Sequence, residues 1–336
     1  MALVEKGLRM TYSNGKNLLF ILSKYGFRAV CFLILLSQGP ASAEDPSLIK
    51  DSAILDKCNK PAPPQWSFKA GQSYFGRNKY IEYIPGTLPI IIIAPHGGYL
   101  TPSSIPPMAN TLERDGGSQE YTHLVAHNLF KLTGHYPHRI INHLTRDRLQ
   151  ANSDKVEATN RNPEAAQAFD EFHNYIEQAK TFVKATCSRG LLLDLHTNGH
   201  DEGWVELGFG LTGSDLNLNS DQLNQTQYFG KTTLHGLILN SKHSFIEIIR
   251  GPSSLGGFLN SAGIKVVPSP QFPGPKSGGY FDGGYNVRKH GSQYGGGIDA
   301  IQIESHFNYV NSGKENREAY SKKLSEAILN FFKSHY

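Results

Sequence analysis

Three short apolar runs, each followed at once by polar residues, constrain the fold of this chain more than any other feature. Each run has the length and composition of a strand that is buried on both faces of a sheet. Because ligands bind at the carboxyl ends of the strands in open α/β sheets, the polar residues are expected at one edge of one sheet. The runs and the residues that follow them are 89–94 with His96, 191–195 with His196, and 298–303 with Glu304.

Helical patterns alternate with these runs. Residues 163–186 carry apolar side chains at alternating spacings of three and four, and a second helix is predicted from Ser118 to Gly134. The alternation predicts an α/β fold, a three-layer sandwich with a largely parallel sheet between helices. Further strands are predicted at 79–84, 138–141, 204–209 and 264–267, an interrupted helical region at 231–259, an ordered lid within the long loop 268–297, and a C-terminal helix.

Composition sets the broad class of the protein. The 336 residues are 39% hydrophobic and 18% charged, enough for one large domain or two small ones. The net charge of +4 is mild and the basic residues are scattered. Nucleic-acid binding needs a clustered basic surface, so we expect no nucleic-acid partner.

The N-terminus has the pattern of a secretory signal peptide. Basic residues precede the apolar run 29–36, and Ala41-Ser42-Ala43 has the form of a cleavage site. We therefore expect a signal peptide at 1–43 and a secreted or periplasmic protein; an uncleaved signal anchor that tethers the chain to the membrane is the alternative. A polar, proline-rich extension is predicted at 44–75 and the main domain at 76–336.

Two cysteines, Cys58 and Cys187, remain after cleavage at residue 43. In an oxidising compartment they could form a disulfide that ties the extension to the main domain. Two unrelated thiols are the alternative, because sequence does not show their separation.

His96 and His196 are plausible zinc ligands, since both follow buried strands at the same expected edge. Asp194 is placed to orient His196 as a supporting carboxylate. A catalytic zinc usually has three protein ligands. Glu120 is our candidate for the third and Asp115 is the reserve; the alternative for Glu120 is that the helix dipole alone favours an acid in a first turn.

Glu304 and the loop 146–152 supply the remaining chemistry. A carboxylate beside a metal can act as general acid and base, whereas a solvated strand-end glutamate is the simpler alternative. Arg146, Arg148 and Asn152 could bind a substrate carboxylate or a developing oxyanion. The alternative for this loop is a solvated segment with internal Arg–Asp pairs.

Four motifs taken together resemble the N-formylglutamate amidohydrolase-like family, which is related to the zinc carboxypeptidases. The motifs are Pro95–Gly98, Arg146–Asn152, Asp194–His196 and Gln302–Glu304. The resemblance covers residues 75–336 and includes Gly251–Gly256 and Tyr280–Tyr285.

This resemblance implies a zinc-carboxypeptidase-like fold with a mixed, mostly parallel sheet, and Zn²⁺ as cofactor. It matches His96 and His196 to the metal histidines, Glu304 to the general acid/base residue and loop 146–152 to the loop that binds the substrate carboxylate. Gln150 and Ser153 stand where the related pattern has an acid and an arginine.

The leading hypothesis is an exported, zinc-dependent hydrolase that cleaves an amide bond in a small molecule or peptide with a free carboxylate. Tyr280, Tyr285 and Arg288 are expected as further substrate contacts. A zinc carboxypeptidase-type peptidase is one alternative. A non-catalytic protein that keeps the fold and binds an anion or glycan is the other, and Gln150 and Ser153 favour it. No stable membrane partner is expected if the signal is cleaved.

Overall fold

The computed structural model describes residue 58, residues 60–109 and residues 113–336. The predicted signal peptide lies outside the described residues, as does the first part of the predicted extension. Within the described ranges, no helix combines the length and the apolar character needed to cross a membrane.

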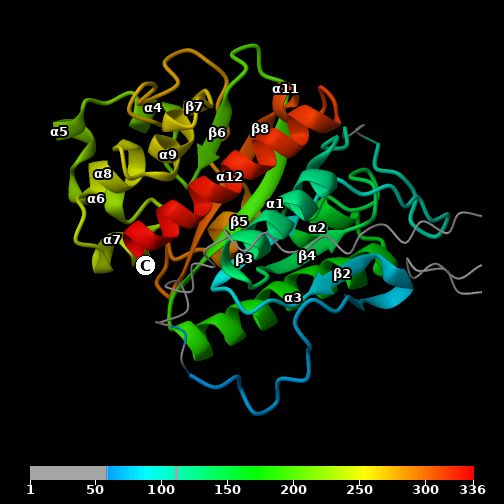
Figure 1. Cartoon of the computed structure of the whole chain (residues 1–336). Coiled ribbons are helices and arrows are strands. Elements are labelled where there is room, and N and C mark those ends of the chain that lie inside the picture. The colour runs from blue at the N-terminus through cyan, green and yellow to red at the C-terminus, as the bar shows by residue number, and fades with distance from the viewer. Residues whose placement is uncertain (1–57, 59, 110–112) are drawn as a thin grey trace, which may run out of the picture. The chain divides into compact units, whose positions relative to one another are not determined.

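An eight-stranded mixed sheet is the framework of the fold (Figure 1). Its strands are β1 (Tyr74–Phe75), β2 (Ile81–Ile84), β3 (Ile90–Ala94), β4 (His138–Asn142), β5 (Gly190–Asn198), β6 (Val205–Gly208), β7 (Val266–Val267) and β8 (Ile298–His306). Their order across the sheet is β1-β2-β4-β3-β5-β8-β6-β7. The central strands β4, β3, β5 and β8 are parallel, whereas β2 and β6 are antiparallel to their central neighbours.

Two hydrophobic cores lie on opposite faces of this sheet. Helices α1 (Ser118–Thr133) and α12 (Lys314–His335) lie side by side over one face, and α3 (Pro163–Cys187) covers the other (Figure 1). Strand β3 separates the cores, because Ile90 and Ile92 belong to one and Ile91 and Ile93 to the other. The predicted three-layer α/β sandwich is therefore confirmed.

Capping residues set the bounds of the two helices that the sequence predicted most clearly. Asn162 accepts hydrogen bonds from the backbone of Glu164 and Ala165, so α3 begins at Pro163. Helix α1 ends before Gly134, whose φ of 77° is the left-handed conformation that glycine adopts easily. The short helices are η2 (Arg77–Lys79), α2 (Lys155–Thr159), α4 (Gly213–Leu216), α5 (Ser220–Leu223), α6 (Thr226–Phe229), α7 (His235–Asn240), α8 (Phe245–Arg250), α9 (Leu255–Ser261), α10 (Tyr285–His290) and α11 (Phe307–Val310).

The structure corrects the expected extents of several elements. Strands β5 and β8 continue through Asn198 and His306, because their backbones remain paired there. The expected loop 268–297 contains α10, and the interrupted helical region contains α7, α8 and α9.

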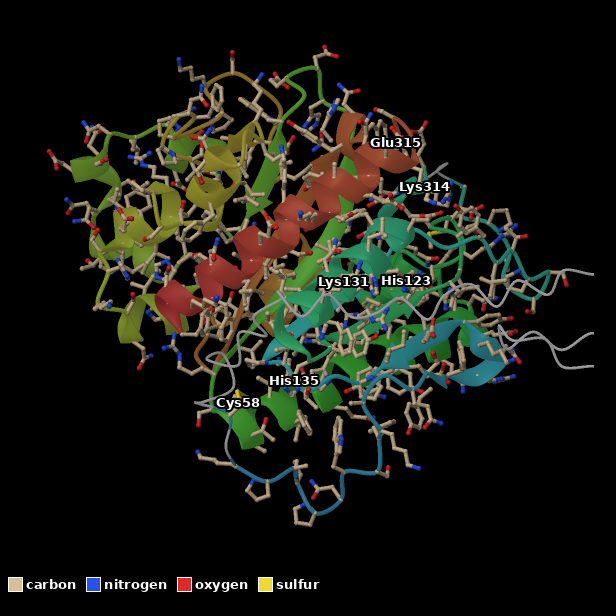
Figure 2. The ribbon with its side chains drawn as sticks, in the orientation of Figure 1. Cys58, His123, Lys131, His135, Lys314 and Glu315 are labelled. Carbon is tan, nitrogen blue, oxygen red and sulfur yellow. A yellow bond between two sulfur atoms is a disulfide. The ribbon has the colours of Figure 1, made fainter. Side chains whose placement is uncertain are left out.

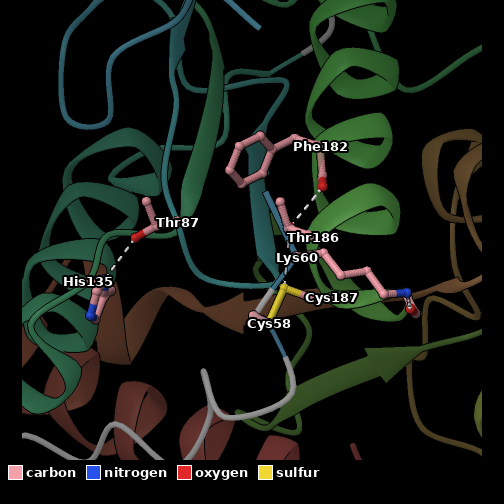
Figure 3. The surroundings of a disulfide bond; sticks show 8 residues. Cys58, Lys60, Thr87, His135, Phe182, Thr186 and Cys187 are labelled. Carbon is pink, nitrogen blue, oxygen red and sulfur yellow. Dashed lines mark hydrogen bonds between the residues drawn. A yellow bond between two sulfur atoms is a disulfide. The ribbon is translucent and has the colours of Figure 1, made fainter. Parts of the chain in front are cut away.

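Cys58 and Cys187 form a disulfide, which confirms the predicted bond and excludes two unrelated thiols. The bond joins the segment before β1 to the last residue of α3 (Figures 2 and 3). Lys60 Nζ also donates to Ser188 Oγ over 3.0 Å, just beyond that helix (Figure 3). Part of the predicted extension is thereby fastened to the main domain.

Candidate metal centre and cavity

The candidate site lies where β5, β8 and β6 pair. His196 on β5 is the register partner of Glu304 on β8, and Glu304 is in turn the partner of Glu206 on β6. Directly paired residues project from the same face of a sheet. The pairing therefore brings one imidazole and two carboxylates together within the sheet itself, rather than in loops beyond it.

His96, Asp115 and His196 form a buried group whose ligand atoms all lie within 4.8 Å of one another. Asp115 Oδ2 lies 2.8 Å from His196 Nδ1 and 3.6 Å from His96 Nδ1. Two ligands on one tetrahedral zinc are about 3.3 Å apart, given zinc bonds of about 2.0–2.1 Å. The spacing of these three side chains therefore suits a single metal ion.

Asp115 is the carboxylate of this group, and this corrects the choice of Glu120. The Asp115 backbone N–H donates to the carbonyl oxygen of His96, so the loop before α1 folds back against the end of β3. Glu120 lies in the first turn of α1 and instead accepts a hydrogen bond of 2.8 Å from the Tyr99 hydroxyl. The first turn of α1 thus directs Glu120 away from the two histidines.

His96 is the residue of this group whose surroundings fit a metal ion best. Its Nδ1 is buried, faces Asp115 beyond hydrogen-bond distance, and has no hydrogen-bond partner among the described residues. Burial lowers the pKa of His96 to about 4, so the ring is neutral and Nδ1 can offer its lone pair to a metal.

Gln150 contacts the other ring nitrogen of His96, Nε2, and also lies against the Arg146 guanidinium. If the amide oxygen faces Arg146, the amide nitrogen donates to His96 Nε2. If the oxygen faces His96, it accepts a hydrogen bond from the Nε2–H and leaves Nδ1 free for a metal. The second orientation suits metal binding and places the amide N–H groups against the guanidinium.

Charge around the group is unbalanced. Asp194 is fully buried, and neither of its oxygens has a hydrogen-bond partner among the described residues. Its Oδ1 lies 3.1 Å from His196 Nε2, beside the ring that the sequence predicted it to orient. Burial would lower the pKa of His196, but Asp194 and Glu304 hold it well above its usual range. A buried excess of carboxylates is costly, and a divalent cation would relieve it.

Burial raises the pKa of Glu304 to about 8. Its Oε1 accepts a hydrogen bond of 2.8 Å from Gln302 Nε2, which fixes the carboxyl group beside His196. Glu304 lines a cavity of about 180 Å³. The residues of the wall are Asp115, Arg146, Asn152, His196, Thr197, Phe281, Asp282, Gly283, Gly284, Gln302 and Glu304.

Two predicted substrate-binding residues lie in this wall. Arg146 is the only lysine or arginine among the described lining residues, and its Nη1 donates to Asp115 Oδ1 over 3.0 Å. Asn152 contacts His196 Nε2 at 3.2 Å, and its Oδ1 accepts from the Asn286 backbone.

The structure places the other predicted contacts elsewhere, because each is engaged by its own neighbours. Arg148 donates to the Ile105 carbonyl, and Tyr285 packs between α10 and α3 against His173. The Tyr280 hydroxyl donates to the Leu207 carbonyl. Arg288 does not line the cavity, but its Nη2 donates over 2.9 Å to Asp282, which does line it.

The sequence reasoning expected the loop that contains 281–284 at the site, but it named none of these four residues as a contact. The glycine pair Gly283-Gly284 is a local signal for them, since glycines allow close backbone approach to a site. Gly208 of β6 confirms such an approach, because a Cβ there would lie 2.4 Å from the Gly283 nitrogen.

No protein-family model matches this chain. No curated protein sequence matches it either. Among solved structures it is similar to a gene product of Agrobacterium tumefaciens, with a TM-score of 0.44 and 11% identity over 73% of this chain and 90% of that one.

The chain is also similar to the N-formylglutamate amidohydrolase of Ralstonia eutropha, with a TM-score of 0.39 and 11% identity over 73% of this chain and 93% of that one. The Ralstonia eutropha protein carries the name of the family that the motifs of this chain resemble. Both TM-scores are below 0.5, so the fold rests on the strand order of this chain and the site rests on its own geometry.

Proposed function

We propose that this chain is an exported, zinc-dependent hydrolase that cleaves an amide bond in a substrate with a free carboxylate. The observation that carries the proposal is the position of Glu304 beside the His96, Asp115 and His196 group, in the wall of one cavity. A cation site next to a general acid/base carboxylate is the arrangement that metal-assisted hydrolysis requires.

His96, Asp115 and His196 would hold the metal ion. The unpartnered Nδ1 of His96 and the excess of buried carboxylates support this assignment. Zinc bound there would act as a Lewis acid that polarises the substrate carbonyl and makes water more acidic. Asp194, at 3.1 Å from His196 Nε2, would keep that ring oriented toward the ion.

Glu304 would move the proton. Burial raises the pKa of its carboxyl group to about 8, and a cation held by the neighbouring group would lower this pKa and favour the ionised form that can act as a base. Glu304 accepts a proton from water as the water oxygen bonds to the amide carbon, and it passes that proton to the nitrogen as the C–N bond breaks. Gln302 holds the carboxyl group in place through its hydrogen bond to Oε1. The products are a carboxylic acid and an amine, with both protons of the water accounted for.

Arg146 and Asn152 would bind the substrate. Arg146 supplies the positive charge of the wall, where it can meet a carboxylate or the oxyanion that develops on the carbonyl. Export is supported by the Cys58–Cys187 disulfide, because disulfides persist mainly in oxidising compartments.

The direct test is Glu304→Gln, assayed with a panel of N-acyl amino acids and peptides with a free C-terminus. We expect hydrolysis to be lost while bound zinc stays near one ion per chain. Glu315→Gln is the matched control, since Glu315 is exposed in the first turn of α12 (Figure 2). Wild-type rates in Glu304→Gln, or no zinc in the purified wild-type protein, would contradict the proposal.

A further inference from the structure

Phe281 is an exposed aromatic residue built into the cavity wall. It is 45% exposed although it lies beside a buried group. Its ring stacks on His200, with centroids 4.8 Å apart and planes inclined by 24°. Because His200 covers one face of the ring, a ligand ring can stack only on the opposite face.

A single buried carboxylate holds both Phe281 and the ring on which it stacks. Glu206 is 0% exposed, and its Oε2 accepts the Phe281 backbone N–H over 2.6 Å. Its Oε1 lies 2.6 Å from His200 Nδ1. Burying a carboxylate is costly unless it is fully bonded, so this arrangement fixes the position of the ring before any ligand arrives.

The neighbouring segments are attached to the sheet in the same way. Trp204 Nε1 donates to the Gly279 carbonyl, and the Gly284 backbone N–H donates to Gln302 Oε1 over 2.6 Å. Residues 281–284 therefore form an ordered part of the cavity wall.

Charge near Phe281 disfavours a carboxylate at this part of the wall. The next residue, Asp282, lines the cavity with its own carboxylate, and Arg288 already pairs with it at 2.9 Å. The group that covers Phe281 should therefore be uncharged and flat.

We propose that Phe281 is a specificity-determining residue, whose ring is a platform for a flat apolar group of the substrate. The inference rests on the proposed function, because it takes the cavity as the substrate site. It narrows the substrate class to N-acyl amino acids or related amides with an aromatic group beside the amide, such as a benzoyl group. Small acyl groups, such as acetyl, leave the platform uncovered.

The test compares the Kd values of N-benzoylglycine and N-acetylglycine by isothermal titration calorimetry, with and without zinc. The Glu304→Gln background keeps both ligands intact. We expect the benzoyl ligand to bind about tenfold more tightly, the scale of one aromatic contact. Phe281→Ala should bring the ratio of the two Kd values close to one, and Phe281→Tyr should restore it.

Phe75→Ala is the matched control, because Phe75 is 44% exposed and contacts a histidine ring, but lies on edge strand β1. The ratio of the two Kd values in Phe75→Ala should equal the ratio in the Glu304→Gln protein without it. Equal Kd values in the Glu304→Gln protein, or a ratio that survives Phe281→Ala, would overturn the platform. A retained ratio with no hydrolysis of N-benzoylglycine by the zinc-loaded wild type would contradict the proposed function and leave the platform standing.

Discussion

The surroundings of His96 decide how well this site can bind a metal ion. Metal binding through Nδ1 requires a proton on Nε2, and of the two ends of the Gln150 amide only the oxygen can accept a hydrogen bond from that N–H. The amide N–H groups then face the Arg146 guanidinium, and neither group has an acceptor there because both are hydrogen-bond donors. An amide at this position therefore serves either His96 or Arg146 well, but not both.

A carboxylate at position 150 would serve both neighbours. We predict that Gln150→Glu raises the affinity for zinc by about tenfold, since a carboxylate that accepts from a ligating histidine strengthens metal binding. Competition with a zinc chelator measures the change, and Gln271→Glu, an exposed position, is the control. Unchanged or weaker affinity in Gln150→Glu would show that His96 does not bind the ion through Nδ1.

The choice between the two acidic candidates for the third ligand is also a single-residue question. Asp115→Ala should lower zinc affinity by at least about tenfold, because it removes a ligand that contacts both histidines. Glu120→Ala should leave the affinity unchanged, because Glu120 contacts Tyr99 instead. The same chelator competition compares them, and the reverse order would restore Glu120 as the ligand.

Between elements, the contact of α3 with α10 depends on neutral histidines. His173 Nδ1 lies 2.8 Å from His290 Nε2, and His290 Nδ1 lies 2.9 Å from Glu177. Burial lowers the pKa of His173 to about 2 and also lowers that of His290. His173 therefore stays neutral in the folded chain well below pH 6.5, so the unfolded chain binds more protons below its own histidine pKa of about 6.5.

Stability should therefore fall as the pH falls below about 6.5. His173 contributes a slope of about 1.4 kcal/mol per pH unit in this range. We predict that His173→Gln, which removes one titrating group, makes the free energy of unfolding less pH-dependent between pH 6.5 and 4.5. Urea unfolding at several pH values measures this slope, and parallel curves for the two proteins would contradict the expected role.

Elements with strong local patterns could be predicted from the sequence, and contacts between distant elements could not. The apolar stripe of α3 and the run of four isoleucines in β3 can be recognised from the sequence alone, as can His96, His196 and Glu304 after their apolar runs. Asp115 has no such pattern, because it reaches the site only through the loop that folds back on His96. The position of Phe281 depends on a hydrogen bond from its backbone N–H to Glu206, which lies 75 residues earlier in the chain.

At the scale of the whole molecule, the Cys58–Cys187 disulfide connects the N-terminal segment to the main domain across 129 residues of sequence. A long closed loop restricts the unfolded chain strongly. We predict that Cys187→Ser, or treatment with a reductant, lowers the free energy of unfolding by about 2–5 kcal/mol. Urea unfolding with and without reductant measures the change, and identical midpoints would show that the disulfide adds no stability.

The central claim is that side chains from β5, the end of β3 and the loop before α1 bind one zinc ion. A crystal structure of the zinc-loaded protein, with anomalous data at the zinc absorption edge, tests it most directly. We predict one anomalous peak at about 2.0–2.2 Å from a nitrogen of His96, a nitrogen of His196 and an oxygen of Asp115. A peak bound by other residues, or none between these three at saturating zinc, would contradict the account.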